Sequence, residues 1–112
     1  MNFKDKFEQF FKTADMSDEW VYSNFTESLL DGLDSAAAFQ IIPQVLDFVL
    51  EQSDSYVRLQ ALGIILALAR RSGTTEIPPG VQEKMNATEK LFLDSDYEKS
   101  QFNELKRFYR IN

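Results

Sequence analysis

Hydrophobic positions recur at the spacing of one helical face from the first residues onward. Phe3, Phe7, Phe10 and Phe11 fall at i, i+4, i+7 and i+8, with charged residues between them. This spacing predicts a first helix over residues 2–14. A phenylalanine stripe can also lie on a membrane surface, but the neighbouring acidic residues disfavour anionic lipid and favour packing against a core.

A second stripe predicts a helix over residues 18–31. Val21, Phe25 and Leu29 recur at every fourth position, which places them on one side of a helix. Ser17 precedes them as a suitable N-cap, and acidic residues follow it in the first turn, where they complement the helix dipole.

Two long apolar segments follow in the middle of the chain. Ser35 is the expected N-cap of the first, residues 36–52, in which Pro43 either kinks the helix or begins it. The second segment, residues 56–71, is apolar nearly all round, which is typical of a helix buried on several sides. Gly63 within it costs about 1 kcal/mol of helix propensity, so we expect close approach by another helix as compensation.

The last third of the chain contains the clearest loop, residues 74–80, with its Pro-Pro-Gly sequence. Helices are predicted on its C-terminal side over residues 81–93 and 97–110. The apolar stripe of the last helix comprises Phe102, Leu105 and Tyr109. No segment shows the alternation of a strand. The pattern therefore predicts an all-α fold of about six helices, arranged as stacked antiparallel helical pairs or as an irregular bundle.

Composition narrows the class of protein. A chain of 112 residues with 44% apolar and 27% charged residues is expected to form one globular domain over residues 1–112. Cysteine and histidine are both absent, which excludes thiol nucleophiles, imidazole bases and the commonest zinc ligands. The longest apolar run has nine residues, too few to cross a membrane. With charges throughout the first residues, no signal peptide is expected and a cytoplasmic location is predicted.

Residues 42–73 carry a pattern shared with a known repeat. An Asp in the turn, Asp54, is followed by Val57 and Arg58 at the start of the second helix. The apolar positions are Pro43, Val45, Leu46, Phe48 and Leu50 in the first helix and Ala61, Leu62 and Leu66 in the second. This segment resembles a HEAT-type helical repeat. The resemblance implies that Asp54 and Arg58 fix the two helices and neighbouring repeats, and that the chain forms a HEAT/ARM-like α–α superhelix.

One acidic segment has the beginning of a calcium-binding loop. Asp94, Asp96 and Glu98 have the early spacing, but Lys99 stands where the glycine is needed and Leu105 where the closing glutamate is needed. A helix cap is the better interpretation of these residues.

Metal binding at other carboxylates, phosphate binding and a serine nucleophile are also weakly supported. Asp31 and Asp34 have carboxylates that a metal can use, but a helix end followed by an N-cap explains them equally well. Neither a Gly-rich phosphate loop nor a G-x-S-x-G sequence occurs. The chain is therefore expected to be no enzyme and to need no cofactor or metal, although a carboxylate enzyme that uses a divalent metal is a minor alternative.

Charge is distributed unevenly along the chain, whose net charge is −6. No Lys or Arg occurs between Lys12 and Arg58, and nine acidic residues lie in that stretch. They are Asp15, Asp18, Glu19, Glu27, Asp31, Asp34, Asp47, Glu51 and Asp54. Such a stretch disfavours nucleic acid and favours a basic protein partner, or it is simply a solvated surface.

The predicted second helix has a second face opposite its apolar stripe. At 100° per residue, Trp20, Asn24, Glu27 and Asp31 fall together on this face. Tryptophan beside acidic residues is typical of an interaction hot spot, although Trp20 can instead fold under the first helix and join the core. With Asp34, these are the residues expected to contact a partner.

These observations predict a non-catalytic module that binds protein and neither nucleic acid nor membrane. A small, acidic, helical chain of this kind is similar to the immunity-type proteins of bacterial toxin–antitoxin pairs. That resemblance implies neutralisation of a basic toxin, such as a nuclease. The alternative is a structural or adaptor subunit that uses an apolar end face to complete a larger helical assembly.

Overall fold

The computed structural model of the protein describes residues 2–15, 17–91 and 96–111, and these contain six α-helices and no strand. The helices are α1 (Phe3–Thr13), α2 (Val21–Asp31), α3 (Ser35–Glu51), α4 (Ser55–Ser72), α5 (Val81–Leu91) and α6 (Asp96–Phe108). The predicted all-α fold is confirmed.

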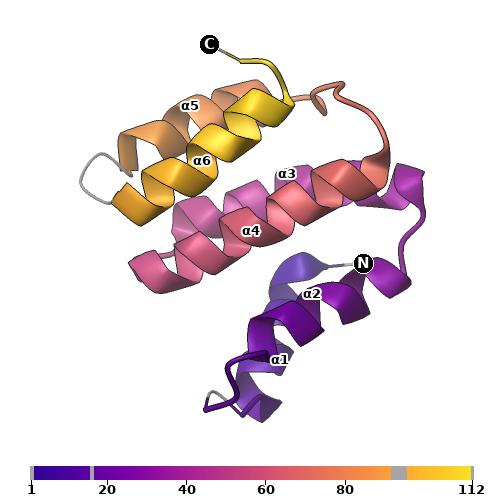
Figure 1. Ribbon diagram of the computed structural model, residues 1–112, viewed down its shortest axis with the longest axis vertical. Coiled ribbons are helices and arrows are strands. Elements are labelled where there is room, and N and C mark those ends of the chain that lie inside the picture. Colours follow the sequence, from indigo (N-terminus) through magenta and orange to yellow (C-terminus); the bar gives the residue numbers. More distant parts are fainter. Residues whose placement is uncertain (1, 16, 92–95, 112) are drawn as a thin grey trace.

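Successive helices form three pairs that stack on one another (Figure 1). The central pair, α3 and α4, has the most extensive contact in the molecule. Helices α1 and α5 pack on α3 from opposite sides, whereas α2 and α6 pack on α4. The molecule therefore has a row of α1, α3 and α5 behind a row of α2, α4 and α6, as the predicted stacking of helical pairs requires.

Helix α4 supplies the centre of the core because it has neighbours on several sides. Its buried residues recur through every turn from Val57 to Ala69, in agreement with its nearly continuous apolar sequence. Its last turn carries Arg70 and Arg71, where cations suit the helix dipole. Gly73 ends the helix in the left-handed conformation, with φ of 72°.

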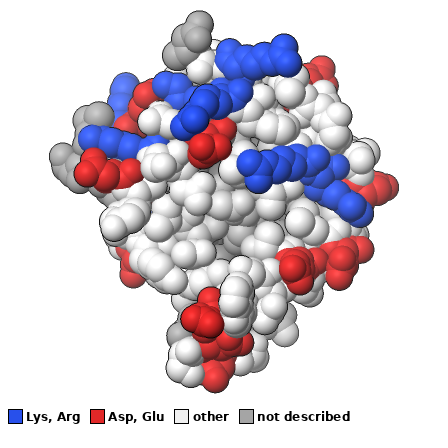
Figure 2. Space-filling view, viewed as in Figure 1, with Lys and Arg blue, Asp and Glu red and all other residues white. Residues whose placement is uncertain are grey.

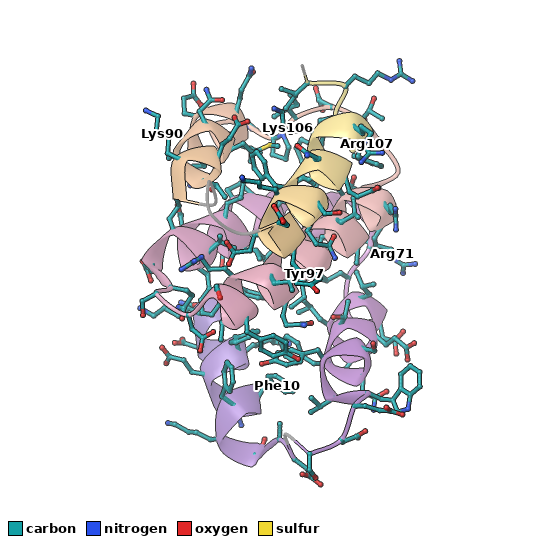
Figure 3. All side chains as sticks on the ribbon, turned by 60° about the vertical axis from the view of Figure 1, so that its left-hand side comes forward. Phe10, Arg71, Lys90, Tyr97, Lys106 and Arg107 are labelled. Carbon is teal, nitrogen blue, oxygen red and sulfur yellow. The ribbon has the colours of Figure 1, made fainter. Side chains whose placement is uncertain are left out.

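The phenylalanine stripe of α1 is a core face. Phe3 and Phe7 are fully buried, and the Phe7 ring lies 4.7 Å from that of Phe48 on α3. Phe10 lies between α1 and α2, where its ring stacks at 4.4 Å on Phe25 (Figure 3). Packing against α2 and α3 thus accounts for Phe3, Phe7 and Phe10, whereas Phe11 at the end of the stripe is 39% exposed. Within the described segments, no helix is long and apolar enough to cross a membrane.

Two expected caps are corrected by the structure. The Ser17 hydroxyl donates a hydrogen bond to Asp15 at 2.6 Å and caps no helix, so α2 begins at Val21 and not at residue 18. At the start of α3, the Asp34 carboxylate accepts from Ala37 N at 2.8 Å, so Asp34 and not Ser35 is the N-cap. At α3 a carboxylate, the stronger acceptor, thus takes the hydrogen bond expected of the neighbouring serine, whereas α2 begins without a side-chain cap.

Pro43 lies inside α3, which continues from Ser35 to Glu51. The interpretation in which the helix begins at Pro43 is therefore wrong. Proline has no N–H to donate to the carbonyl of Phe39, so α3 lacks one of its internal hydrogen bonds.

Arg58 ties three helices together near the turn of the central pair. Its Nη1 donates to the carbonyl of Gln52, after the end of α3, at 2.9 Å. Its Nη2 donates to Glu98 Oε1, in the first turn of α6, at 3.3 Å. The carboxylate of Asp54 caps α4 by accepting from the N–H groups of Tyr56 and Val57. Both residues therefore hold the fold together around the turn between α3 and α4. The resemblance to a HEAT repeat stays a prediction.

Glu98, one of the residues with calcium-loop spacing, is therefore engaged within the fold. Its side chain is only 2% exposed and pairs with Arg58. Asp94 lies outside the described residues, and Asp96 is exposed at the start of α6.

Candidate protein-binding face

The outward face of α2 carries four of the five residues predicted to contact a partner. Trp20 is 62% exposed, and Asn24, Glu27 and Asp31 are also exposed. The alternative in which Trp20 joins the core is wrong, because Phe25 and Leu29 occupy the inward side of α2. Trp20 precedes the helix, and its backbone N–H donates to the carboxylate of Asp18 at 2.9 Å. An indole this exposed leaves a large apolar area available to a partner.

Asp34, the fifth predicted residue, stands apart from that face. It lies between α2 and α3, where its carboxylate caps α3. Its side chain is exposed, but its position is explained by the helix that it begins.

The acidic stretch does not form one continuous face. On α3, Asp47 pairs with Lys84 at 2.8 Å and Glu51 pairs with Lys4 at 3.3 Å. By contrast, Glu27 and Asp31 on α2 take part in no ion pair with any described residue. The uncompensated negative charge of the stretch is therefore concentrated toward α2.

The distribution of charge is visible on the side of the molecule formed by α2, α4 and α6 (Figure 2). Lysine and arginine lie in the upper half of this view, whereas the charged residues at its lower end, over the N-terminal pair, are acidic. A broad uncharged area separates the two. The acidic residues on this side of the molecule therefore lie toward one end of the stack.

Two hollows follow the seam between α2 and α4. The first has a volume of about 330 Å³ and is lined by Tyr22, Ser23, Thr26, Glu27, Gln60, Gly63 and Ile64. The second has a volume of about 270 Å³ and is lined by Glu27, Leu30, Asp31 and Arg71. Glu27 borders both. Sequence reasoning missed this seam because it depends on the pairing of two helices that are not consecutive.

Arg71 brings one positive charge to the second hollow. Its Nε donates to the carbonyl of Leu33 at 3.1 Å, which anchors the side chain beside the end of α2. Figure 3 shows Arg71 at the edge of α4 on the side toward α2. The second hollow is therefore mixed in charge, whereas Glu27 is the only charged residue among those that line the first.

Gly63 is one of the residues that line the first hollow, and its surroundings correct the expectation of close helix packing. A Cβ atom added there meets Gln101 Nε2 at 3.9 Å and no nearer atom of the described residues. That distance is ordinary van der Waals contact. No neighbouring helix therefore explains why a glycine occupies the middle of α4.

Tyrosine side chains are prominent on the same side of the molecule. Tyr56 is 56% exposed, and its ring lies 5.7 Å from that of Tyr22 in an edge-on arrangement. Partial burial raises the pKa of Tyr22, and Tyr56 and Asp54 nearby raise it further. Tyr97, on the first turn of α6, is 78% exposed (Figure 3). Tyrosine and tryptophan are enriched at protein interfaces, so these rings extend the candidate face beyond α2.

The chemistry available at this face is that of recognition. Its groups are carboxylates, hydroxyls, amides and aromatic rings, which bind by charge, hydrogen bonding and burial of apolar area. No protein-family model matches the chain, and neither a curated protein nor a solved structure is significantly similar to it.

Proposed function

We propose that this protein is a non-catalytic binding module that uses the outward face of α2 to hold a basic protein. The observation that carries the proposal is the pair Glu27 and Asp31, which are exposed on the same side of α2 as the exposed Trp20 and have no ion pair among the described residues. The partner we propose is a toxin, which the module neutralises in the manner of an immunity protein.

The physical roles on this face divide between charge and burial. Glu27 and Asp31 attract cationic side chains and accelerate encounter with a basic surface. Trp20 contributes binding free energy through the area that it loses to solvent in the complex. Because the inward side of α2 packs on α4 and α1, the face is presented by a helix and not by a loop.

The experiment that tests this proposal starts with capture. The protein is immobilised, exposed to native cell extract at low salt and eluted with a salt gradient. We expect one basic protein to be released at moderate salt; it is then identified, purified and titrated against the module. Its association should slow as salt is added, since electrostatic steering is screened.

The contact residues are tested by charge reversal. The double variant Glu27→Lys/Asp31→Lys should bind the purified partner at least about tenfold more weakly, which corresponds to about 1.4 kcal/mol. The matched control is Glu8→Lys/Glu76→Lys, which changes the net charge equally at exposed residues of α1 and of the loop before α5. Its affinity should stay within about twofold of the parent protein.

Two results contradict the proposal. If the parent and the Glu27/Asp31 variant bind with equal affinity, the assignment of these residues to the binding site is wrong. The second result is a salt gradient that releases no basic protein, together with a homo-oligomer that persists in about 0.5 M salt. Screening at that salt leaves a Debye length of roughly 4 Å, so such an oligomer is held by apolar contact and favours the adaptor subunit instead.

A further inference from the structure

The first hollow along the α2–α4 seam is lined by uncharged residues except for one carboxylate. Resting on the proposed function, we infer that this hollow receives an arginine side chain from an exposed loop of the basic partner. The guanidinium would pair with Glu27, and its apolar stem would lie across Gly63.

The charge pattern selects a cation. Glu27 is the only charged residue that lines the first hollow, and it has no ion-pair partner among the described residues. A carboxylate at the edge of an otherwise neutral hollow attracts a cationic group more strongly than one in open water, because the hollow removes part of the screening. The second hollow already contains Arg71 beside its two acids, so it is the poorer cation site.

The lining selects arginine among cations. Tyr22 forms part of the wall, and the ring of Tyr56 lies against it. A planar guanidinium can stack on a tyrosine face while it donates two hydrogen bonds to a carboxylate, which the ammonium group of lysine cannot do. The hydroxyls of Ser23 and Thr26 and the amide of Gln60 supply polar edges for the remaining donors and for the peptide backbone of the loop.

Gly63 supplies an independent argument. Glycine is unfavourable within a helix, yet no described atom lies closer than 3.9 Å to the position of an added Cβ. The fold itself therefore gives no reason for a glycine here. Its place in the lining of the hollow gives one, because a lining residue without a side chain lets a partner reach the backbone of α4.

The hollow is tested first with a small probe on the isolated full chain. Isotope-labelled protein is titrated with acetyl-arginine amide and followed by NMR. We expect saturable shifts concentrated at the amides of Ser23, Glu27, Gln60 and Gly63. The citrulline counterpart has nearly the same shape and no charge, and it should leave these amides unmoved.

Matched variants make the titration specific. Glu27→Gln should abolish the saturable shifts, whereas Asp31→Asn, which changes only the second hollow, should preserve them. Equal shifts with citrulline, or arginine-induced shifts spread evenly over the exposed acids of α1 and α2, overturn the inference.

The role of Gly63 is tested with the basic partner recovered by capture. Gly63→Leu fills the hollow and should weaken binding about tenfold or more, whereas Ala67→Leu, one turn further along α4 and outside the lining of either hollow, should bind as the parent does. Gly63→Ala is a milder variant that keeps the fold, as an unchanged or raised unfolding midpoint will show. Full affinity for the partner in both Gly63 variants overturns the inference.

The two proposals fail in different ways. If charge reversal at Glu27 and Asp31 lowers the affinity for the partner but the Gly63 variants do not, the binding face stands and the arginine hollow is wrong. If the arginine probe occupies the hollow but no basic partner is found, the hollow stands and the proposed function is wrong.

Discussion

At the scale of single residues, Arg58 shows how one charged side chain can be held inside a small helical protein. Its side chain is 14% exposed, and it satisfies a carbonyl of the central turn and a carboxylate of α6 that is 2% exposed. Burial makes both charges costly on their own, so each depends on its partners. The resemblance to a HEAT repeat implied a structural role for Arg58, but Glu98 lies forty residues further along the chain and carried no such indication.

Removing only Arg58 should therefore destabilise the fold. Arg58→Leu is expected to lower the free energy of unfolding by about 3 kcal/mol, because the buried carboxylate of Glu98 loses this cation. The double variant Arg58→Leu/Glu98→Leu should recover part of the loss. Urea unfolding measures both, with Arg107→Leu as the control: its ion pair with Glu104 is exposed and should contribute less than about 1 kcal/mol. A single variant as stable as that control contradicts this account.

Tyr109 is a second buried polar residue, with a different balance of costs. It is 5% exposed, and its hydroxyl is buried with no hydrogen-bond partner among the described residues. Burial raises its pKa to about 12, since the ionised form loses its hydration. The fold thus keeps a phenol where a plain ring would pack as well.

The pH dependence of stability follows from that pKa. Unfolded tyrosine ionises near pH 10, whereas folded Tyr109 keeps its proton to about pH 12. The contribution of this group is fully present below pH 10 and is lost as pH rises between the two values, because the unfolded chain then binds fewer protons. Tyr109→Phe should be at least as stable as the parent at pH 7 and should lose less stability between pH 10 and 12. Parallel urea midpoints for the two proteins across that range contradict the assignment.

At the scale of elements, the apolar spacing located every helix, whereas the residues that begin them were harder to identify. Ser17 and Ser35 were both expected to cap because serine is a common N-cap. Beside Ser35, the carboxylate of Asp34 takes the capping hydrogen bond, whereas Ser17 donates to Asp15 and α2 begins without a side-chain cap. Proline was likewise ambiguous in the sequence, because the same residue can begin a helix or lie within it. Competition between adjacent acceptors and tertiary packing decided these points, and neither is encoded in spacing.

The cap of α3 provides the corresponding prediction. Asp34→Ala should lower the free energy of unfolding by about 1 kcal/mol, because the N–H of Ala37 loses its acceptor. Ser35→Ala is the adjacent control and should change stability by less than about 0.5 kcal/mol, since Ser35 occupies the first position within the helix. Equal losses from the two substitutions, measured by thermal or urea unfolding, contradict this division of roles.

At the scale of the whole molecule, stacked pairs were predictable but the candidate site was only half predictable. The outward face of α2 follows from helical geometry alone, which is why Trp20 and Glu27 could be placed on it. The hollows require α2 to lie against α4. Gln60 and Gly63 belong to α4, which is separated from α2 in the sequence by the whole of α3. No periodicity within one segment contains that information.

The stacking has a consequence for how the molecule opens. Each outer pair packs chiefly against the central pair, so each has its own boundary with the rest of the protein. The N-terminal pair is attached through its phenylalanine cluster and the exposed Lys4–Glu51 ion pair, whereas the C-terminal pair is anchored through the buried Arg58–Glu98 contact.

Such a boundary lets an end pair detach without global unfolding. Backbone amides of α1 and α2 should therefore exchange with deuterated solvent faster than those of α3 and α4. A partner that grips α2 and α4 across their seam should slow exchange in the whole N-terminal pair, including the amides of α1, and leave α5 unaffected. Uniform exchange rates along the chain contradict separate opening. Partner binding would hold the N-terminal pair against the central pair and suppress its separate opening.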